Sequence, residues 1–248
     1  MNVSIITVTF NSEETLQGTI DSVQSQDYPN IEYIVIDGKS KDRTVDIIKD
    51  NQAVISKWIS ESDKGLYDAM NKGIQMATGD VVGIINSDDF YHRKDAISSI
   101  VKGLKESNAE CVFGDVDFVR PKNLNKVIRH YSSKRFAPWK FRLGYMPAHP
   151  TFYTYKRNFE KFGYYKTDYR IAADFELLIR FLFKEKLSFK YIPETILRMR
   201  TGGTSTASVK STLIINKENK RALKENGIYG NYLMLTSRYF TKILEFIR

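Results

Sequence analysis

Blocks of apolar and polar residues alternate along the first 120 residues, and each block has the length of a strand or a helix. Residues 3–10 are apolar and rich in β-branched side chains, which is typical of a strand buried on both faces. Behind the polar residue Asn11, the residues Leu16, Ile20 and Val23 recur at helical spacing and predict a helix to about residue 26. The same reasoning predicts strands at 31–36, 54–59, 81–85, 111–113 and 116–119, the last two as one strand or two, and helices at 44–49, 68–77 and 95–105.

Strands that alternate with helices at this spacing predict an α/β fold with a mostly parallel central sheet flanked by helices. The carboxyl ends of parallel strands lie at one edge of such a sheet, and ligands bind beyond that edge. Polar residues follow the predicted strands at 9–11, 37–40, 60–63 and 86–89. The sequence therefore places its candidate site at this edge.

The pattern is less regular beyond residue 120. Residues 120–142 are basic and contain two prolines, which predicts a mobile segment over the sheet. An amphipathic helix is predicted at 174–183, a short strand at 189–192 and a lysine-rich helix at 210–226. In the final stretch, 232–247, aromatic and aliphatic side chains stand between basic ones.

The composition excludes several classes of protein. Of the 248 residues, 42% are hydrophobic and 27% charged, which is too apolar for a disordered chain. The single cysteine, Cys111, excludes a disulfide scaffold and, with only three histidines, argues against a Cys/His zinc site. No apolar run approaches the ~18 residues of a membrane span, and the N-terminal stretch lacks the basic start of a signal peptide. We therefore expect a cytoplasmic location.

Charge is divided unevenly along the chain. Residues 1–119 hold 11 Lys/Arg against 20 Asp/Glu, a net charge of −9, and residues 120–248 hold 27 Lys/Arg against 9 Asp/Glu, a net charge of +18. An acidic half supplies metal ligands, and a basic half is a surface for phosphates, nucleic acid or an acidic membrane. A nucleic-acid-binding module is therefore one alternative, although no known binding motif is present.

Two adjacent carboxylates, Asp88 and Asp89, follow an apolar predicted strand, after Asn86 and Ser87. Neighbouring carboxylates repel one another and need a compensating cation. Magnesium-like ions are usually held by one or two carboxylates together with substrate phosphates. A turn or a helix cap would explain the same residues without any chemistry.

Residues 37–44 form a second polar motif, which begins with Asp37 at the end of a predicted strand. A strand–turn–helix connection explains Gly38, Ser40 and Asp42, since glycine allows a tight turn and serine or aspartate caps a helix. Such a connection does not explain Asp37, which lies where the base or ribose of a nucleotide would bind.

Together these motifs resemble family 2 glycosyltransferases of the GT-A fold. The resemblance implies a domain over residues 1–205 that transfers a sugar, with inversion, from a nucleoside diphosphate sugar to a saccharide or lipid-linked saccharide, in cell-surface polysaccharide or glycolipid assembly. Residues 206–248 are predicted to form a helical C-terminal extension. The matching segments are Thr9-Phe10-Asn11, 37–44, 86–89, 146–150, 171–177 and 202–205.

The resemblance also implies roles for individual residues. Asp89 would ligate a divalent cation, Mn²⁺ or Mg²⁺, and Asp88 would lie beside the ribose or in the outer shell of the metal. Asp37 would hold the base or ribose, and Asn71 and Lys72 would reach the pyrophosphate. The residues expected at the nucleotide are Thr9, Asn11, Glu13, Asp37, Asp63, Asn71, Lys72 and Asp88.

Asp174 matches the catalytic base of the family, which would take the proton of the acceptor hydroxyl. In many members a glutamate precedes that position, whereas this chain has Ala173, so Glu176 is a weaker second candidate. Asp174 is expected at the start of a helix, where the helix dipole stabilises its anion. Further contacts with the acceptor or with phosphate are expected from His149, Glu176, Arg200, Gly203 and Ser205.

Other interpretations remain beside this one. A nucleotidyltransferase uses a similar sheet, but here the turn after the first strand carries Asn11, Glu13 and Glu14 in place of a glycine-rich basic loop for a triphosphate. A lone histidine is usually structural or solvated, so this explanation of His149 stands beside the functional one. The segments 210–226 and 232–247 either pack on the sheet or contact an acidic membrane near a lipid-linked acceptor.

Overall fold

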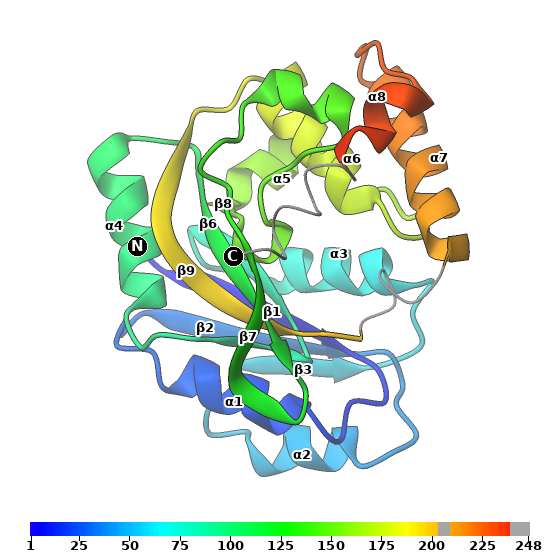
Figure 1. The fold of residues 1–248 in the computed structure, drawn as a ribbon. Helices are drawn as coiled ribbons and strands as arrows, with labels where there is room; N and C mark the ends of the chain where they lie inside the picture. Colours follow the sequence, from blue (N-terminus) through cyan, green and yellow to red (C-terminus); the bar gives the residue numbers. More distant parts are fainter. Residues whose placement is uncertain (203–208, 239–248) are drawn as a thin grey trace.

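The computed structural model describes residues 1–202 and 209–238 and has a mixed α/β fold, with one curled sheet that carries helices on both faces (Figure 1). The α/β architecture predicted from the sequence is confirmed. The strands are β1 (Val3–Thr9), β2 (Ile31–Asp37), β3 (Lys57–Ser60), β4 (Val81–Asn86), β5 (Asp89–Tyr91), β6 (Cys111–Arg120), β7 (Asn123–Tyr131), β8 (Tyr153–Tyr155) and β9 (Phe189–Arg200). The helices are α1 (Leu16–Gln24), α2 (Thr44–Asp50), α3 (Leu66–Met76), α4 (Ala96–Ser107), α5 (Lys156–Phe162), α6 (Ala173–Ile179), α7 (Val209–Glu225) and α8 (Tyr232–Thr236), with a π-helical turn at Arg180–Lys184 and 3₁₀ turns at Pro138–Leu143 and His149–Thr151.

The strand order is β3-β2-β1-β4-β8-β6-β9-β5, and β7 pairs with β6. The first four strands run parallel, as predicted for a chain in which strands and helices alternate. Thr9 on β1 lies opposite Asp37 on β2, which in turn lies opposite Ser60 on β3. On the other side of β1, Val8 lies opposite Asn86 on β4. The polar residues that follow these strands therefore share one edge of the sheet.

Two apolar layers cover the two faces of the sheet. The apolar sides of α1, α2 and α4 pack on one face, and α3 and α6 pack on the other. Helix α7 lies beside α6 (Figure 1), and Ala222 and Leu223 near its end belong to the same core layer as α3 and α6. Among residues 1–202 and 209–238, no helix combines the length and the apolar character that crossing a bilayer requires.

The prediction of a mobile segment at 120–142 is wrong, because this segment contains β7, which pairs antiparallel with the end of β6. Most of the side chains of β7 are exposed or half-buried. A strand that buries little apolar surface shows no clear alternation of apolar and polar residues. The sequence of β7, which is basic and lies between two prolines, therefore gave no sign of a strand.

Strand β9 is longer than the predicted strand at 189–192 and continues to Arg200. Pro193 interrupts the apolar pattern, and proline is rare inside a sheet. Here the pairing of β9 with β6 shifts register between Phe113 and Asp115, next to that proline. The strand resumes beyond the shift and pairs with β5 on its other side.

Some predictions fall outside the described residues. The predicted domain boundary at residue 205 and the predicted site residues Gly203 and Ser205 lie there, as does the end of the stretch 232–247 beyond residue 238.

Candidate functional site

Asp37, the last residue of β2, is fully buried at the carboxyl edge of the sheet. Its Oδ2 accepts hydrogen bonds from the Ser40 backbone N–H at 3.0 Å and from Ser60 Oγ at 2.5 Å, and its Oδ1 accepts one from Ser40 Oγ. These bonds fix the turn after β2 against the end of β3. Asp37 therefore shapes the floor of the site.

Asp63 lies directly over that turn. A Cβ atom added at Gly38 would come within 3.0 Å of Asp63 Oδ2 and 3.3 Å of the Phe10 ring, so a larger residue there would force one of these side chains to shift. The Phe10 ring is 59% exposed, although it is large and apolar. On β1 beside it, Thr9 Oγ1 is buried and has no hydrogen-bond partner in the described part of the chain. The exposed Phe10 ring and the Thr9 hydroxyl therefore lie beside the carboxylates at the ends of these strands.

The loop after β1 is tied to the loop after β2. Asn11 adopts a left-handed conformation (φ 49°), and its Oδ1 accepts a hydrogen bond from the Lys41 backbone N–H at 2.9 Å. The Glu13 carboxylate accepts one from the Arg43 N–H at 3.0 Å. Both predicted nucleotide residues therefore lie at the edge of the sheet, where their side chains hold the neighbouring loop.

Lys72 on α3 is surrounded by acids. Its Nζ lies 2.6 Å from Asp63, 2.8 Å from Glu61 and 3.5 Å from Asp68. Although burial opposes it, pairing with Asp63 and Glu61 raises the pKa of Lys72. Asn71, in contrast, uses both ends of its amide to hold the backbone of Tyr165, at 2.8 and 2.9 Å. Lys72 therefore lies beside Asp63, whereas the Asn71 side chain holds the backbone at Tyr165.

Asp88 lies between β4 and β5, and Asp89 is the first residue of β5 and is fully buried. Asp89 Oδ2 accepts a hydrogen bond from Asn86 Nδ2 at 3.1 Å, whereas its Oδ1 has no hydrogen-bond partner among residues 1–202 and 209–238. Burial raises the pKa of Asp89, and the neighbouring charge of Asp88 raises it further. Burial also raises the pKa of Asp88. A buried carboxylate oxygen without a partner is unfavourable unless a cation reaches it.

Arg200, at the end of β9, brings positive charge to this pair. Its guanidinium donates a hydrogen bond to the backbone carbonyl of Asp88 and lies 5.1 Å from the centre of the Phe90 ring. Burial lowers the pKa of Arg200, while Asp88 and Asp89 act in the opposite direction. The predicted phosphate contact therefore lies beside the predicted metal ligand.

The donor atoms at Asp89 suit a divalent cation, because magnesium-like ions prefer carboxylate oxygens and no described residue is hydrogen-bonded to Asp89 Oδ1. In the described part of the chain no three side chains of His, Cys, Asp or Glu come together as a metal cage. The remaining positions around an ion at Asp89 would be filled by substrate phosphate or water, as is usual for such ions.

Asp174, in the first turn of α6, is half-buried, and its Oδ1 accepts a hydrogen bond from the Phe175 N–H at 2.7 Å. Burial raises the pKa of Asp174, His149 opposes this shift and Glu218 adds to it. Burial lowers the pKa of His149 although Asp174 acts against that. Asp174 is therefore a stronger base than an exposed aspartate, and His149 loses its proton more readily than an exposed histidine.

Two tyrosines form an aromatic wall at Asp174. The rings of Tyr67 and Tyr165 stack with their centres 5.7 Å apart, and the Tyr165 hydroxyl is hydrogen-bonded to His149 Nε2 at 2.7 Å. The Tyr67 hydroxyl donates to the Ile171 carbonyl. Burial, and then the charge of Asp174, raise the pKa of both phenols, which stay neutral.

Helix α7 holds the segment that precedes Asp174. The Glu218 carboxylate accepts hydrogen bonds from the backbone N–H groups of Arg170 at 2.7 Å and of Ile171 and Ala172 at 2.9 Å each. Free N–H groups near a helix N-terminus favour a negative charge. Glu218 therefore positions the start of α6 and the candidate base.

Glu176, the second candidate base, is fully buried in an ion pair. Its carboxylate lies 2.9 Å from Arg180 Nη2 and 3.1 Å from Lys166 Nζ, and it accepts a weaker bond from Asn226 at 3.3 Å. Arg180 in turn donates to the backbone carbonyls of residues 162–164. These contacts give Glu176 a structural role and favour Asp174 as the base.

Sequence reasoning did not single out Phe10 or Glu218. Phe10 lies in one of the matching motifs, but the sequence predicted it as the end of the buried strand 3–10, whereas β1 ends at Thr9 and the Phe10 ring is exposed. Glu218 has no local signal, because its partners lie 46 to 48 residues away along the chain.

Comparison with known proteins gives a family match. The family model described as glycosyl transferase family 2 matches residues 4–180. An uncharacterized glycosyltransferase of Mycobacterium tuberculosis is 34% identical over 181 residues, which cover 72% of this chain and 68% of that protein. An Escherichia coli UDP-Glc:alpha-D-GlcNAc-diphosphoundecaprenol beta-1,3-glucosyltransferase, WfaP, is 37% identical over 92 residues, 36% of each chain.

A solved structure has the same fold. The mannosyltransferase PcManGT of Pyrobaculum calidifontis, in complex with GDP-Man and Mn²⁺, superimposes with a TM-score of 0.65 at 19% identity. The match covers 93% of this chain and 65% of that one, so this chain spans about two thirds of the solved protein. The GT-A fold implied by the sequence motifs is confirmed.

Proposed function

Since this chain belongs to glycosyl transferase family 2, we propose that it transfers a sugar from a nucleoside diphosphate sugar to an acceptor hydroxyl, with inversion at the anomeric carbon. The observation that carries the proposal is the set of carboxylates at the carboxyl edge of the sheet, Asp37, Asp63 and the Asp88–Asp89 pair. Ligands of parallel sheets bind there. An acidic edge suits a diphosphate when a cation lies between them.

The nucleoside end would lie over β1 and β2. The exposed Phe10 ring offers a stacking face for a base, and the unused Thr9 hydroxyl and the Asp63 carboxylate offer hydrogen bonds to base or ribose. Asn11, Glu13 and Asp37 hold the loops that frame this place. The E. coli relative, whose name describes a UDP-Glc donor, supports a nucleotide sugar as the donor.

The diphosphate would lie near Asp88, Asp89 and Arg200. We propose that Asp89 holds a divalent cation through Oδ1, with Asp88 beside the ribose or in the outer shell and Arg200 near the phosphates. A cation bound there offsets the negative charge that the diphosphate gains as it leaves. The Mn²⁺ in the PcManGT complex supports a divalent ion, either Mn²⁺ or Mg²⁺.

Asp174 would act as the general base. As the acceptor oxygen bonds to the anomeric carbon, its proton passes to the Asp174 carboxylate, and the electron pair of the breaking bond leaves with the diphosphate. The raised pKa makes this carboxylate a stronger base than an exposed one. The stacked rings of Tyr67 and Tyr165 would shield the Asp174 carboxylate from water, and the hydrogen bond with His149 would hold Tyr165 in position.

The acceptor would be a saccharide or a lipid-linked saccharide of cell-surface polysaccharide or glycolipid assembly. The support is the E. coli relative, whose name describes a diphosphoundecaprenol-linked acceptor. The family match argues against the nucleotidyltransferase and the nucleic-acid-binding alternatives. A cytoplasmic location, for which a buried, unpaired Cys111 is suitable, stays a prediction.

A thermal-shift screen tests the proposal. The protein is heated with UDP, GDP, ADP, TDP or their sugars, each with and without Mn²⁺ or Mg²⁺, because a ligand that binds the native state raises the melting temperature. We expect one nucleoside diphosphate to stabilise the protein, and only with a divalent ion. A melting temperature that no nucleotide raises would contradict the proposed donor.

A further inference from the structure

One face of α7 is turned outward and is cationic. Lys210, Leu213, Lys217, Lys220 and Lys224 are exposed and follow one another at spacings of three or four residues, which places them on a single stripe of the helix. The stripe contains four lysines, one leucine and no acid.

Both acidic residues of α7 are engaged elsewhere. Glu218 binds the backbone of residues 170–172. Glu225 lies 2.8 Å from Lys166 and 2.6 Å from Arg221, and although burial opposes it, these partners lower the pKa of Glu225 to about 2. The positive charge of the outer stripe is therefore not neutralised by acids on its own helix.

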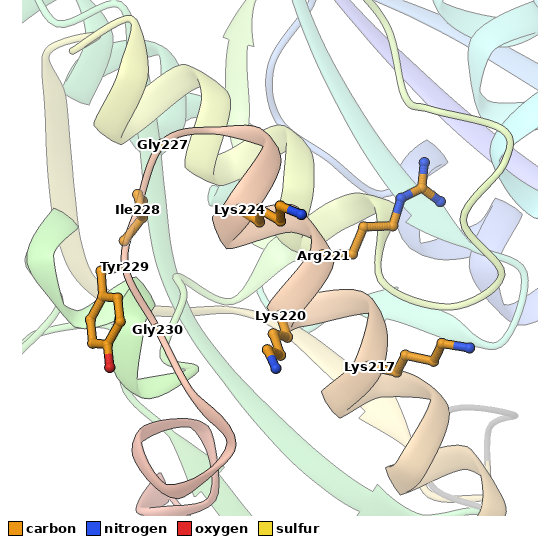
Figure 2. Close-up of a pocket in the computed structure, with 8 residues that line it drawn as sticks. All are labelled: Lys217, Lys220, Arg221, Lys224, Gly227, Ile228, Tyr229 and Gly230. Carbon is orange, nitrogen blue, oxygen red and sulfur yellow. The ribbon is translucent and has the colours of Figure 1, made fainter.

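A groove of about 540 Å³ runs between α7 and the following loop, 227–230 (Figure 2). Lys217, Lys220, Arg221 and Lys224 line its helix side, and Tyr229 projects from the loop. The groove is thus open, basic and bordered by an aromatic ring.

Large apolar side chains on α7, on the loop 227–230 and on α8 are exposed to solvent. Leu213 is 66% exposed, Tyr229 74% and Leu233 on α8 81%. Tyr232 is also exposed, and Lys220 Nζ lies 4.5 Å from the centre of its ring. Aromatic and basic side chains that occur together in this way are typical of the membrane–water interface.

We infer that this surface, formed by the outer stripe of α7, the loop 227–230 and the start of α8, binds a membrane that contains anionic lipids. The four lysines complement lipid phosphates, and each contributes to attraction near an anionic leaflet. Leu213 and Leu233 gain from entering the acyl boundary, whereas a nucleic acid or a free phosphate would leave both in water. The combination of positive charge and exposed apolar side chains therefore favours a lipid bilayer over a nucleic acid or a free phosphate as the ligand.

The same helix links this surface to the candidate base. Glu218 on α7 holds the backbone that leads into Asp174, so the helix that carries the outer stripe also contacts the segment before the candidate base. A lipid-linked acceptor would then be presented close to the transfer site, a consequence that rests on the proposed function. The membrane contact itself does not depend on it.

Vesicle flotation tests the inference with the full chain and no substrate. Vesicles of phosphatidylcholine alone are compared with vesicles of equal parts phosphatidylcholine and phosphatidylglycerol. We expect binding to the anionic vesicles only, and weaker binding as salt rises. The triple variant Lys217→Ala, Lys220→Ala, Lys224→Ala is expected to bind about 100-fold more weakly, from roughly fivefold per lysine.

A matched variant controls for net charge. Lys49→Ala, Lys102→Ala, Lys105→Ala removes the same charge from α2 and α4, and it is expected to float like the intact protein. Leu233→Ser is expected to weaken binding without changing the charge. Each variant is also melted with the nucleotide found in the screen, and an unchanged nucleotide shift shows that the fold and the donor site are intact.

Several outcomes would overturn the inference. Intact protein that stays at the bottom of the gradient with anionic vesicles removes it, and so does a control variant that loses as much binding as the α7 variant. Equal binding to neutral vesicles would exclude the role of the lysines. Binding to RNA or heparin that outcompetes the vesicles would identify a polyanion as the occupant. None of these results bears on nucleotide binding, so failure of the donor proposal remains distinguishable.

Discussion

The acidic side chains near the sheet edge differ in how fully their oxygens are hydrogen-bonded. Asp37 is bound by two serines and Glu176 by Arg180 and Lys166, so both are satisfied within the protein. Asp89 and Asp174 have raised pKa values because burial is not fully compensated. Groups held in this unfavourable state are candidates for ligand binding and proton transfer.

The variant Asp89→Asn tests two expected effects of burying this carboxylate, one on the stability of the fold and one on metal binding. A carboxyl group whose pKa is raised in the folded state stabilises the fold below its unfolded pKa, and this contribution is lost as pH rises through the folded pKa. The variant is therefore expected to gain about 1–3 kcal/mol in free energy of unfolding at pH 7, with a difference that disappears in acid. Denaturant unfolding without metal, repeated across pH, measures it.

The same variant is expected to lose metal-dependent stabilisation by the nucleotide, because the side chain loses its negative charge and one of the two oxygens that could bind the ion. Asp21→Asn, an exposed carboxylate on α1, is the control and should change neither quantity. A variant that still responds to Mn²⁺ or Mg²⁺ with the wild-type shift would remove Asp89 from the metal site.

The raised pKa of Asp174 also predicts a pH profile. Proton transfer needs the carboxylate form, so the rate of transfer should rise with pH through the raised pKa of Asp174 and level off above it. His149 has a lowered pKa and stays neutral in the upper part of that range. A rate that is flat from the ordinary pKa of an aspartate upward would show that burial does not tune this base.

At the scale of elements, the hydrogen bonds of Glu218 connect α7 to the start of α6. Glu218→Gln keeps the size of the side chain and removes its charge. Two effects are expected: a lower kcat with little change in KM for the donor, and an acid limb of the pH profile at lower pH, because Glu218 helps to raise the pKa of Asp174. Loss of stability alone would not move that limb. An unshifted limb would limit Glu218 to a structural role.

The parallel strands and their helices could be predicted because each buries an apolar face, as β1 and α1 do. What could not be predicted depends on distant partners. Strand β7 is ordered by pairing with β6, and β9 passes Pro193 through a register shift that no local pattern records. The motif residues Asp37, Asp63 and Asp89 were found at the predicted edge, whereas Tyr165, the partner of Asn71, lies 94 residues away along the chain.

For the whole molecule, the described part of the C-terminal extension belongs to the main core. Leu223 and Leu235 are fully buried, in the layer that also contains α3 and α6. Leu223→Ala should lower the free energy of unfolding of the entire protein by about 2–5 kcal/mol in one cooperative transition. Leu213→Ala, an exposed site on the same helix, is the control. A separate early transition confined to the C-terminal helices would show that they form an independent unit.

The central claim is that Asp174 takes the proton of the acceptor while the acidic sheet edge holds the nucleotide. The most direct test measures release of nucleoside diphosphate and binding of the donor in Asp174→Asn and in the wild type, with the donor identified by the screen. We predict a rate reduced by about 10²–10⁴-fold with donor affinity retained. Turnover at the wild-type rate in Asp174→Asn would contradict the account.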